Sequence, residues 1–305
     1  MSPSEVHPIE VLRSLGYSDV TDLAPVSGGW DTAIWRFATQ DGDRHVLRIY
    51  RSADRQLAAK RELVALGAAG AAGLPAPTVE AHGSWQNRPA VVLSWRPGEP
   101  VVQYLARKPW LLWRFSRQFG QLQARIHAVP VPQALREGAP SYWLVRAGGG
   151  AEMDVSHLES AGLTTDTFVH MDFHPLNVLT DGRSITGVVD WTNAGAGDAR
   201  ADLAWTTTLL RVGPMPPHPL NPILRWARGL FYLGWRRGYE SQAGPIPDLA
   251  PFLLWAGNLL LNEVLPRIDD PQVWASAKDF QPLRQWIEHW ERRVRVNESS
   301  GNYTL

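Results

Sequence analysis

The segment that decides the fold is residues 168–191, with the sequence FVHMDFHPLNVLTDGRSITGVVDW. It contains the pattern H-x-D-x-x-x-x-N, formed by His170, Asp172 and Asn177, and it leads to a second carboxylate, Asp190. Carboxylate and amide side chains can hold a cation, and a carboxylate can also take up a proton. What these side chains can do together therefore depends on how the residues between them fold.

A β-hairpin is predicted between Asn177 and Asp190. The turn signal Asp181–Gly182 separates two short apolar runs, and Asp-Gly favours the tight turns that join antiparallel strands. Because a hairpin folds back on itself, Asn177 and Asp190 would lie side by side. Their oxygens are ligands that Mg²⁺ takes together with phosphates and water. Asp172 would then be free to accept the proton of an attacking hydroxyl, which is the division of roles found in kinases.

An alternative treats His170, Asp172 and His174 as alternate residues of one strand. They would then face the same way, as the ligands of a metallohydrolase do. Against this alternative, Pro175 and the hairpin favour a loop, and no further His-rich motif supplies the missing ligands. His170 is instead expected to support the loop backbone, and for His174 a surface position and a substrate contact both remain open.

The composition bounds the class of protein. A length of 305 residues suggests two domains or one domain of two lobes, and 30 basic and 30 acidic side chains give no net charge. Neither nucleic acid nor a membrane surface is therefore expected as a partner. The absence of cysteine excludes disulfides, thiolate metal sites and a cysteine nucleophile. Without a secretion signal or an apolar run long enough to span a bilayer, a cytoplasmic location is expected.

Local patterns divide the chain near residue 95. Residues 1–95 are predicted to be β-rich with one inserted helix, and residues 96–305 to be mainly helical. The strands expected in the first part are residues 26–37, 44–50 and 89–95, and its helix is residues 55–72. The helices expected in the second part are residues 101–128, 202–210, 223–239, 251–265 and 283–294.

Further motifs surround the segment 168–191. In chain order they are Ser27 to Thr32 (SGGWDT), Val46 to Ile49 (VLRI), Arg61-Glu62, Leu93 to Arg96 (LSWR), Gln123 to His127 (QARIH) and Gly197 to Ala204 (GDARADLA). In this order they resemble the aminoglycoside phosphotransferase and choline kinase superfamily. The resemblance implies an α+β, protein-kinase-like fold of two lobes. Its small β-rich N-lobe, residues 1–95, would bind nucleotide, and its larger, mainly helical C-lobe, residues 96–305, would hold the catalytic residues and the phosphoryl acceptor.

The resemblance also implies roles for the site residues. Asp172 is expected to be the catalytic base, Asn177 and Asp190 to hold Mg²⁺, and Asp202 to support the catalytic loop. The residues expected to bind the nucleotide, through a glycine loop, a cation with its acidic partner and the hinge beside the adenine, are Ser27, Gly28, Gly29, Arg48, Glu62, Ser94 and Arg96. The implied activity is transfer of the γ-phosphoryl group of ATP, or of GTP, to an alcohol hydroxyl of a small molecule.

Two positions depart from the family pattern. Arg48 stands where the family often has lysine, and Asp31 where many relatives have asparagine. An arginine can still grip phosphate, but its planar head changes how Glu62 and the nucleotide are aligned. A non-catalytic, pseudokinase-like nucleotide-binding module is therefore the alternative function. The presence of Asp172, Asn177 and Asp190 together favours the enzyme.

The phosphoryl acceptor is expected to be sugar-, antibiotic- or amino-alcohol-like. Residues 206–305 carry 11 basic and nine acidic side chains, and this balance does not favour a polycationic aminoglycoside. The same part is rich in tryptophan, and most of these side chains are expected in the core, with one or two available to line an acceptor pocket. The expected partners are thus a nucleoside triphosphate and a small hydroxyl compound, and the oligomeric state is left open.

Overall fold

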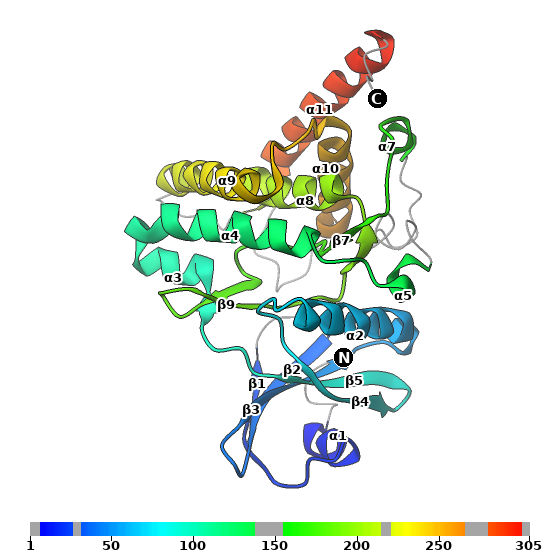
Figure 1. The fold of residues 1–305 in the computed structure, drawn as a ribbon, viewed down its shortest axis with the longest axis vertical. Coiled ribbons are helices and arrows are strands. Elements are labelled where there is room, and N and C mark those ends of the chain that lie inside the picture. Colours follow the sequence, from blue (N-terminus) through cyan, green and yellow to red (C-terminus); the bar gives the residue numbers. More distant parts are fainter. Residues whose placement is uncertain (1–6, 27–31, 138–154, 215–220, 266–279, 301–305) are drawn as a thin grey trace.

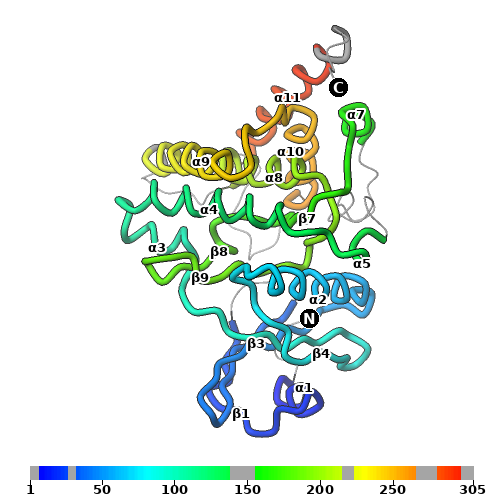
Figure 2. Tube along the Cα trace, viewed as in Figure 1, coloured from blue at the N-terminus to red at the C-terminus, as the bar shows by residue number. Residues whose placement is uncertain are grey.

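The computed structural model describes residues 7–26, 32–137, 155–214, 221–265 and 280–300 (Figure 1). In these residues the chain is α+β, with a sheet in the N-terminal part and mostly helices beyond it. Figure 2 shows the same arrangement along the Cα trace, with the N-terminal strands at one end of the molecule and helix α11 at the other. Among the described residues, none of the helices combines the length and the apolar character needed to cross a bilayer.

The N-terminal part is an antiparallel sheet in the order β1-β2-β3-β5-β4. Its strands are β1 (Val20–Val26), β2 (Thr32–Thr39), β3 (Arg44–Tyr50), β4 (Val79–Trp85) and β5 (Arg88–Ser94). The predicted pairing of β2 with β3 is confirmed, with Trp35 opposite Leu47. Gly42 in their connection has a φ of 85°, a conformation that glycine adopts at little cost.

A helix covers each face of this sheet. Helix α2 (Gln56–Ala71) corresponds to the predicted helix and packs on the face that includes Val91 and Leu93. Helix α1 (Pro8–Ser14) was not predicted, and its Val11 and Leu12 are fully buried on the opposite face with Val92. The expectation of one helix in the first 95 residues was therefore wrong. Since β5 is buried on both faces, its sequence is a continuous apolar run rather than an alternating one.

The chain leaves the five-stranded sheet after β5. Strand β6 (Glu99–Pro100) pairs with β8 (Val178–Thr180), and β8 pairs with β9 (Ile185–Val188) in the predicted hairpin. Strand β7 (Thr167–Val169) pairs with β10 (Gly195–Gly197). These two small sheets hold both ends of the segment 168–191 in place.

Helices make up most of the rest. They are α3 (Val101–Arg107), η3 (Pro109–Leu111), α4 (Leu112–His127), α5 (Gln133–Arg136), α7 (Ser156–Ser160), α8 (Ala199–Val212), α9 (Asn221–Ala243), α10 (Ala250–Val264) and α11 (Gln281–Ser300); a 3-10 turn, η2 (Ala53–Arg55), precedes α2. Helices α4 and α9 lie so close that a Cβ at Gly120 would meet the Trp235 carbonyl at 2.0 Å. Trp235 and Trp255 are fully buried, whereas Trp226 is 67% exposed, so the tryptophans in α9 and α10 are mostly core.

Candidate functional site

The central loop, residues 170–177, connects β7 to β8 and is held by α8. Met171 has a φ of 60°, a left-handed conformation that is costly for a residue with a side chain. Asp202 stabilises it by accepting the Met171 N–H at 2.7 Å. His127 and Gln123 donate to the other oxygen of Asp202 at 2.9 and 3.1 Å. Burial alone would raise the pKa of Asp202, but His127 lowers it, so a buried negative charge anchors the loop.

Asp172 lies on this loop with both carboxylate oxygens engaged. Asn177 Nδ2 donates to Oδ2 at 3.2 Å and to the Asp172 carbonyl at 3.0 Å. Trp205 Nε1 donates to Oδ1 at 3.3 Å, and His174 Nε2 lies 3.7 Å from the same oxygen. The side chain is 19% exposed. Because each carboxylate oxygen can accept more than one hydrogen bond, Asp172 is able to accept a further one from a hydroxyl that approaches the loop.

Asn177 and Asp190 are neighbours across the hairpin, where the Val189 N–H donates to the Asn177 carbonyl at 2.9 Å. The amide nitrogen of Asn177 is turned toward Asp172, so its oxygen faces the other way. Asp190 is 37% exposed, and its Oδ1 accepts from Thr192 at 2.8 Å. One amide oxygen and one carboxylate, both partly open, fit Mg²⁺, which usually keeps waters and substrate phosphates as its other ligands.

Arg48 connects the N-terminal sheet to this pair. Its Nη1 donates to Glu62, and its Nη2 donates to Asp190 at 3.2 Å and to Thr192 at 3.0 Å. Tyr50 donates to the second oxygen of Glu62 at 2.5 Å. Arg48 and Glu62 are both buried. Although burial disfavours the charged form, Glu62 and Asp190 raise the pKa of Arg48, so the guanidinium stays charged between two carboxylates from distant parts of the chain.

The chain was compared with known proteins. The family model of the phosphotransferase enzyme family (APH) matches residues 22–148 and 152–240. The chain belongs to this family. Viomycin phosphotransferase of Streptomyces vinaceus is 31% identical over an alignment of 139 residues, which covers 38% of this chain and 48% of that relative. The chain therefore matches about half the length of this relative.

Two solved structures share the fold. An amicoumacin kinase in complex with AMP-PNP, Ca²⁺ and Ami superposes with a TM-score of 0.61 at 13% identity, with 95% of each chain covered. An aminoglycoside-3′-phosphotransferase of type VIII superposes with a TM-score of 0.57 at 17% identity, with 85% of this chain and 100% of the other covered. These similarities confirm the expected kinase-like α+β fold, and the match to the family model confirms the expected superfamily.

Of the other residues that were expected to bind the nucleotide, only some lie in the part of the chain that the structure describes. Ser27, Gly28 and Gly29 lie outside the described residues. The Ser94 N–H donates to Thr78 O at 2.9 Å, so it is already occupied at the end of β5. The Arg96 side chain donates through Nε to Thr186 O at 3.2 Å, and this bond ties the segment after β5 to the hairpin.

His170 is fully buried and supports the loop. Its Nδ1 accepts the Asp172 N–H at 3.3 Å, and its ring packs 4.7 Å from that of Trp191. Burial lowers the pKa of His170, so the ring is neutral. In the described part of the chain, no three His, Cys, Asp or Glu side chains gather as metal ligands. The metallohydrolase alternative, which needs His170, Asp172 and His174 to converge, finds no support here.

Three side chains of the site were not predicted: Tyr50, Thr192 and Trp205. Tyr50 could have been found, because it follows Arg48 by two residues and alternate residues of a strand share a face. Trp205 follows Asp202 by three residues, a spacing that places both on one face of a helix. Thr192 carries no comparable signal, because its contact with Arg48 depends on how the N-terminal sheet docks.

Proposed function

We propose that this phosphotransferase is a small-molecule kinase. It transfers the γ-phosphoryl group of a Mg²⁺-bound nucleoside triphosphate to an alcohol hydroxyl of a sugar-, antibiotic- or amino-alcohol-like acceptor. The observation that carries the proposal is the position of Asp172, a partly exposed carboxylate on a fixed loop directly beside Asn177, which neighbours Asp190. A base next to two metal-binding oxygens is what phosphoryl transfer requires.

Each residue has a role in this proposal. Asp172 orients the acceptor hydroxyl and takes its proton, while Asn177 and Asp190 hold Mg²⁺. The cation would neutralise charge on the phosphates. Arg48, fixed by Glu62, adds positive charge at the boundary between the proposed N-lobe, residues 1–95, and the proposed C-lobe, residues 96–305. The nucleotide would lie between the lobes, with its phosphates at the backbone of residues 27–29 and its base beside Ser94 and Arg96.

The identity of the nucleotide and the cellular location of the protein are part of the same proposal. ATP is favoured by the AMP-PNP in the complex of the structurally similar amicoumacin kinase, and GTP is the competitor to be tested. A cytoplasmic protein agrees with a cysteine-free sequence and with a nucleoside triphosphate as co-substrate.

The charge of the helices after Asp172 favours an acceptor that is not a polycation. Between Asp202 and Glu240 the sequence has no acidic residue and five arginines, which are Arg211, Arg225, Arg228, Arg236 and Arg237. Helix α8 holds Trp205 against Asp172 and ends about 10 Å further on, where Arg228 donates to Gly213 O at 2.9 Å. Burial lowers the pKa of Arg228 to about 10, and repulsion from Arg211 and Arg225 adds to this effect.

A non-catalytic nucleotide-binding module is the second candidate function. The observation that favours it is Arg48, whose guanidinium is engaged by Glu62, Asp190 and Thr192. An arginine held in this way has fewer N–H groups to offer a phosphate. The two candidates differ in a single property, because a module binds nucleotide without turning it over.

The test is a panel of acceptors with MgATP or MgGTP. Viomycin, amicoumacin, kanamycin, a macrolide and choline are assayed for nucleotide turnover, and the product is identified by ³¹P NMR. Asp172→Ala is expected to lower turnover by about a hundredfold to ten-thousandfold while nucleotide still raises the melting temperature. Asp190→Ala is expected to weaken binding of the Mg²⁺-nucleotide itself in calorimetry. Asp41→Ala, an exposed turn residue, is the matched control.

The outcomes separate the candidates. Nucleotide binding without turnover on any acceptor would establish the module. Full turnover by Asp172→Ala would remove Asp172 from the chemistry. A response to kanamycin and viomycin alone would contradict the argument from charge, because both carry several positive charges.

A further inference from the structure

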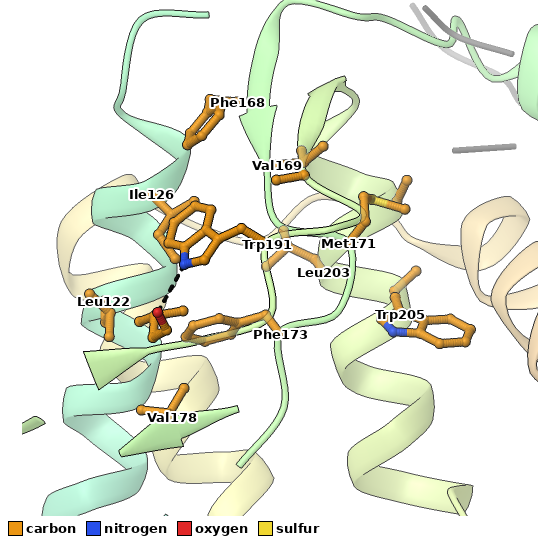
Figure 3. Close-up of a cluster of buried hydrophobic side chains, with 14 of the residues drawn as sticks. Leu122, Ile126, Phe168, Val169, Met171, Phe173, Val178, Trp191, Leu203 and Trp205 are labelled. Carbon is orange, nitrogen blue, oxygen red and sulfur yellow. Dashed lines mark hydrogen bonds between the residues drawn. The ribbon is translucent and has the colours of Figure 1, made fainter. Parts of the chain in front are cut away.

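One face of α8 follows the central loop residue by residue. Figure 3 shows Trp205 on this helix, and Met171 and Phe173 on the loop. Its side chains form three bonds to three consecutive loop residues: Asp202 to the Met171 N–H, Trp205 to the Asp172 carboxylate, and Thr206 to the Phe173 carbonyl. The spacing i, i+3, i+4 places the three side chains on the same side of the helix. Two of these bonds fix the backbone. The third, from Trp205, reaches the side chain of Asp172.

Trp205 is built into the core and has little freedom to move. It is 1% exposed, and its Nε1 lies 3.3 Å from Asp172 Oδ1. Asn177 donates to the other oxygen at 3.2 Å. The torsion that rotates a carboxylate is broad when nothing restrains it. Two donors from different elements, one on each oxygen, restrict that rotation and set the direction in which the remaining lone pairs point.

An indole is chemically suited to this position. Its N–H donates only, and it carries no proton that titrates near neutral pH. It therefore orients a base without competing with it for the proton. His174 Nε2 lies 3.7 Å from the same oxygen, which is beyond hydrogen-bond distance. A hydrogen bond from a buried donor to a carboxylate is also stronger than one between neutral groups.

We propose that Trp205 is a positioning residue that fixes the Asp172 carboxylate for the acceptor hydroxyl. The inference rests on the proposed function, because it assigns Asp172 the role of base. It goes beyond that function in placing part of the site on α8, outside the loop and the hairpin. A purely structural tryptophan would affect the stability of the fold and leave turnover per folded molecule unchanged.

The first test removes the N–H and keeps the ring. Trp205 is replaced by phenylalanine and, where that variant folds poorly, by β-(3-benzothienyl)alanine, in which sulfur stands in place of the indole N–H. Trp255→Phe, a fully buried tryptophan on α10, is the matched control. With the panel acceptor that turns over fastest, kcat is expected to fall about tenfold to a hundredfold in both Trp205 variants. The KM for MgATP should stay within about twofold, since no ground-state contact to the nucleotide is lost.

The second test is a double substitution. If Trp205 acts only through Asp172, then Trp205→Phe should lower kcat no further in an Asp172→Ala background. A multiplicative effect of the two changes would overturn the inference. An undiminished kcat in the benzothienyl variant would also overturn the inference about Trp205. If Asp172→Ala loses turnover in the same assay, the proposed function would remain intact. Full turnover by Asp172→Ala would instead refute the proposed function.

A third measurement needs no acceptor. In protein labelled with ¹⁵N-tryptophan, the indole signal of Trp205 is assigned by its loss in Trp205→Phe. Asp172→Ala removes the carboxylate that accepts this N–H, and the indole proton signal should shift toward that of an unbonded indole. The other indole signals serve as internal controls. An unchanged Trp205 signal would show that the contact does not exist in solution and would overturn the inference whatever the kinetics.

Discussion

Replacement of Glu62 by glutamine tests the charge balance on which the site depends. Glu62 is 1% exposed and accepts hydrogen bonds from Arg48 and, at 2.5 Å, from Tyr50. Glutamine keeps the shape but removes the charge and turns one oxygen into a donor. Because Asp190 also raises the pKa of Arg48, the guanidinium would stay charged and would lose its most buried partner.

The expected cost follows from what Arg48 retains. Removing one partner of a buried ion pair costs about 3–5 kcal/mol. Arg48 keeps its hydrogen bonds to Thr192 at 3.0 Å and to Asp190 at 3.2 Å, so its charge would not be left without a partner. Asp190 compensates that charge only in part, because it is 37% exposed and partly screened by water. We therefore expect the free energy of unfolding to fall by about 3 kcal/mol, the low end of that range. Tyr50→Phe removes a single bond to a charged acceptor and should cost about 1.5–2 kcal/mol.

The measurement is urea unfolding followed by circular dichroism in the absence of nucleotide. The combined variant Arg48→Met/Glu62→Leu is the control, because replacing both partners by apolar side chains leaves no buried charge and should restore much of the stability lost in Glu62→Gln. A cost below about 1 kcal/mol for Glu62→Gln would refute the reasoning, since it would mean that the pair behaves like one in contact with water. The same conclusion would follow if the combined variant were less stable than Glu62→Gln.

Two further predictions concern packing and pH. Gly120→Ala should lower the free energy of unfolding by about 3 kcal/mol or more, because its Cβ would lie 2.0 Å from Trp235 O. The control is Gly67→Ala on α2, where a Cβ would meet nothing within 4 Å, and it should raise the free energy of unfolding by about 0.5–1 kcal/mol. Equal melting temperatures for the two variants would contradict this prediction. Burial lowers the pKa of His170 from 6.5, so its contribution to stability is present above pH 6.5 and is lost as the pH falls through the lowered value. Unfolding free energies measured at several pH values should therefore decline more steeply on acidification than those of His170→Gln, and parallel curves would count against a neutral buried ring.

The sequence predicted those parts of the fold that local patterns determine. The β2–β3 and β8–β9 hairpins follow from turn signals, and α2 and β5 follow from helix-forming and continuous apolar runs. Helix α1 was missed because it is only seven residues long and is stabilised by docking on the sheet. Strand β4 was missed because its sequence, VEAHGSW, has few residues that favour strands, and it is held by its partner β5.

The site, like the fold, has parts that local patterns determine and parts that depend on how distant elements pack. Asn177 and Asp190 were correctly expected side by side because a hairpin joins them. The pair formed by Arg48 and Glu62 followed from the family resemblance and is present. The hydrogen bond from Trp205 to Asp172 joins residues 33 positions apart. The spacing from Asp202 indicates that Trp205 faces the loop, but which loop atom its N–H reaches depends on how α8 packs against the loop, and no pattern in either segment contains that.

The arginine at position 48 is best understood together with its neighbours. Its two terminal nitrogens donate hydrogen bonds to carboxylates on different elements, Glu62 on α2 and Asp190 after β9. A lysine ammonium is a single point of charge and cannot present the separated N–H groups of a guanidinium fork. Tyr50 and Thr192 complete the arrangement by donating to the same two carboxylates. The arginine that replaces the family's lysine is thus accompanied by two hydroxyl groups that donate hydrogen bonds to the carboxylates around it. This arrangement argues for a site adapted to Arg48 rather than one damaged by it.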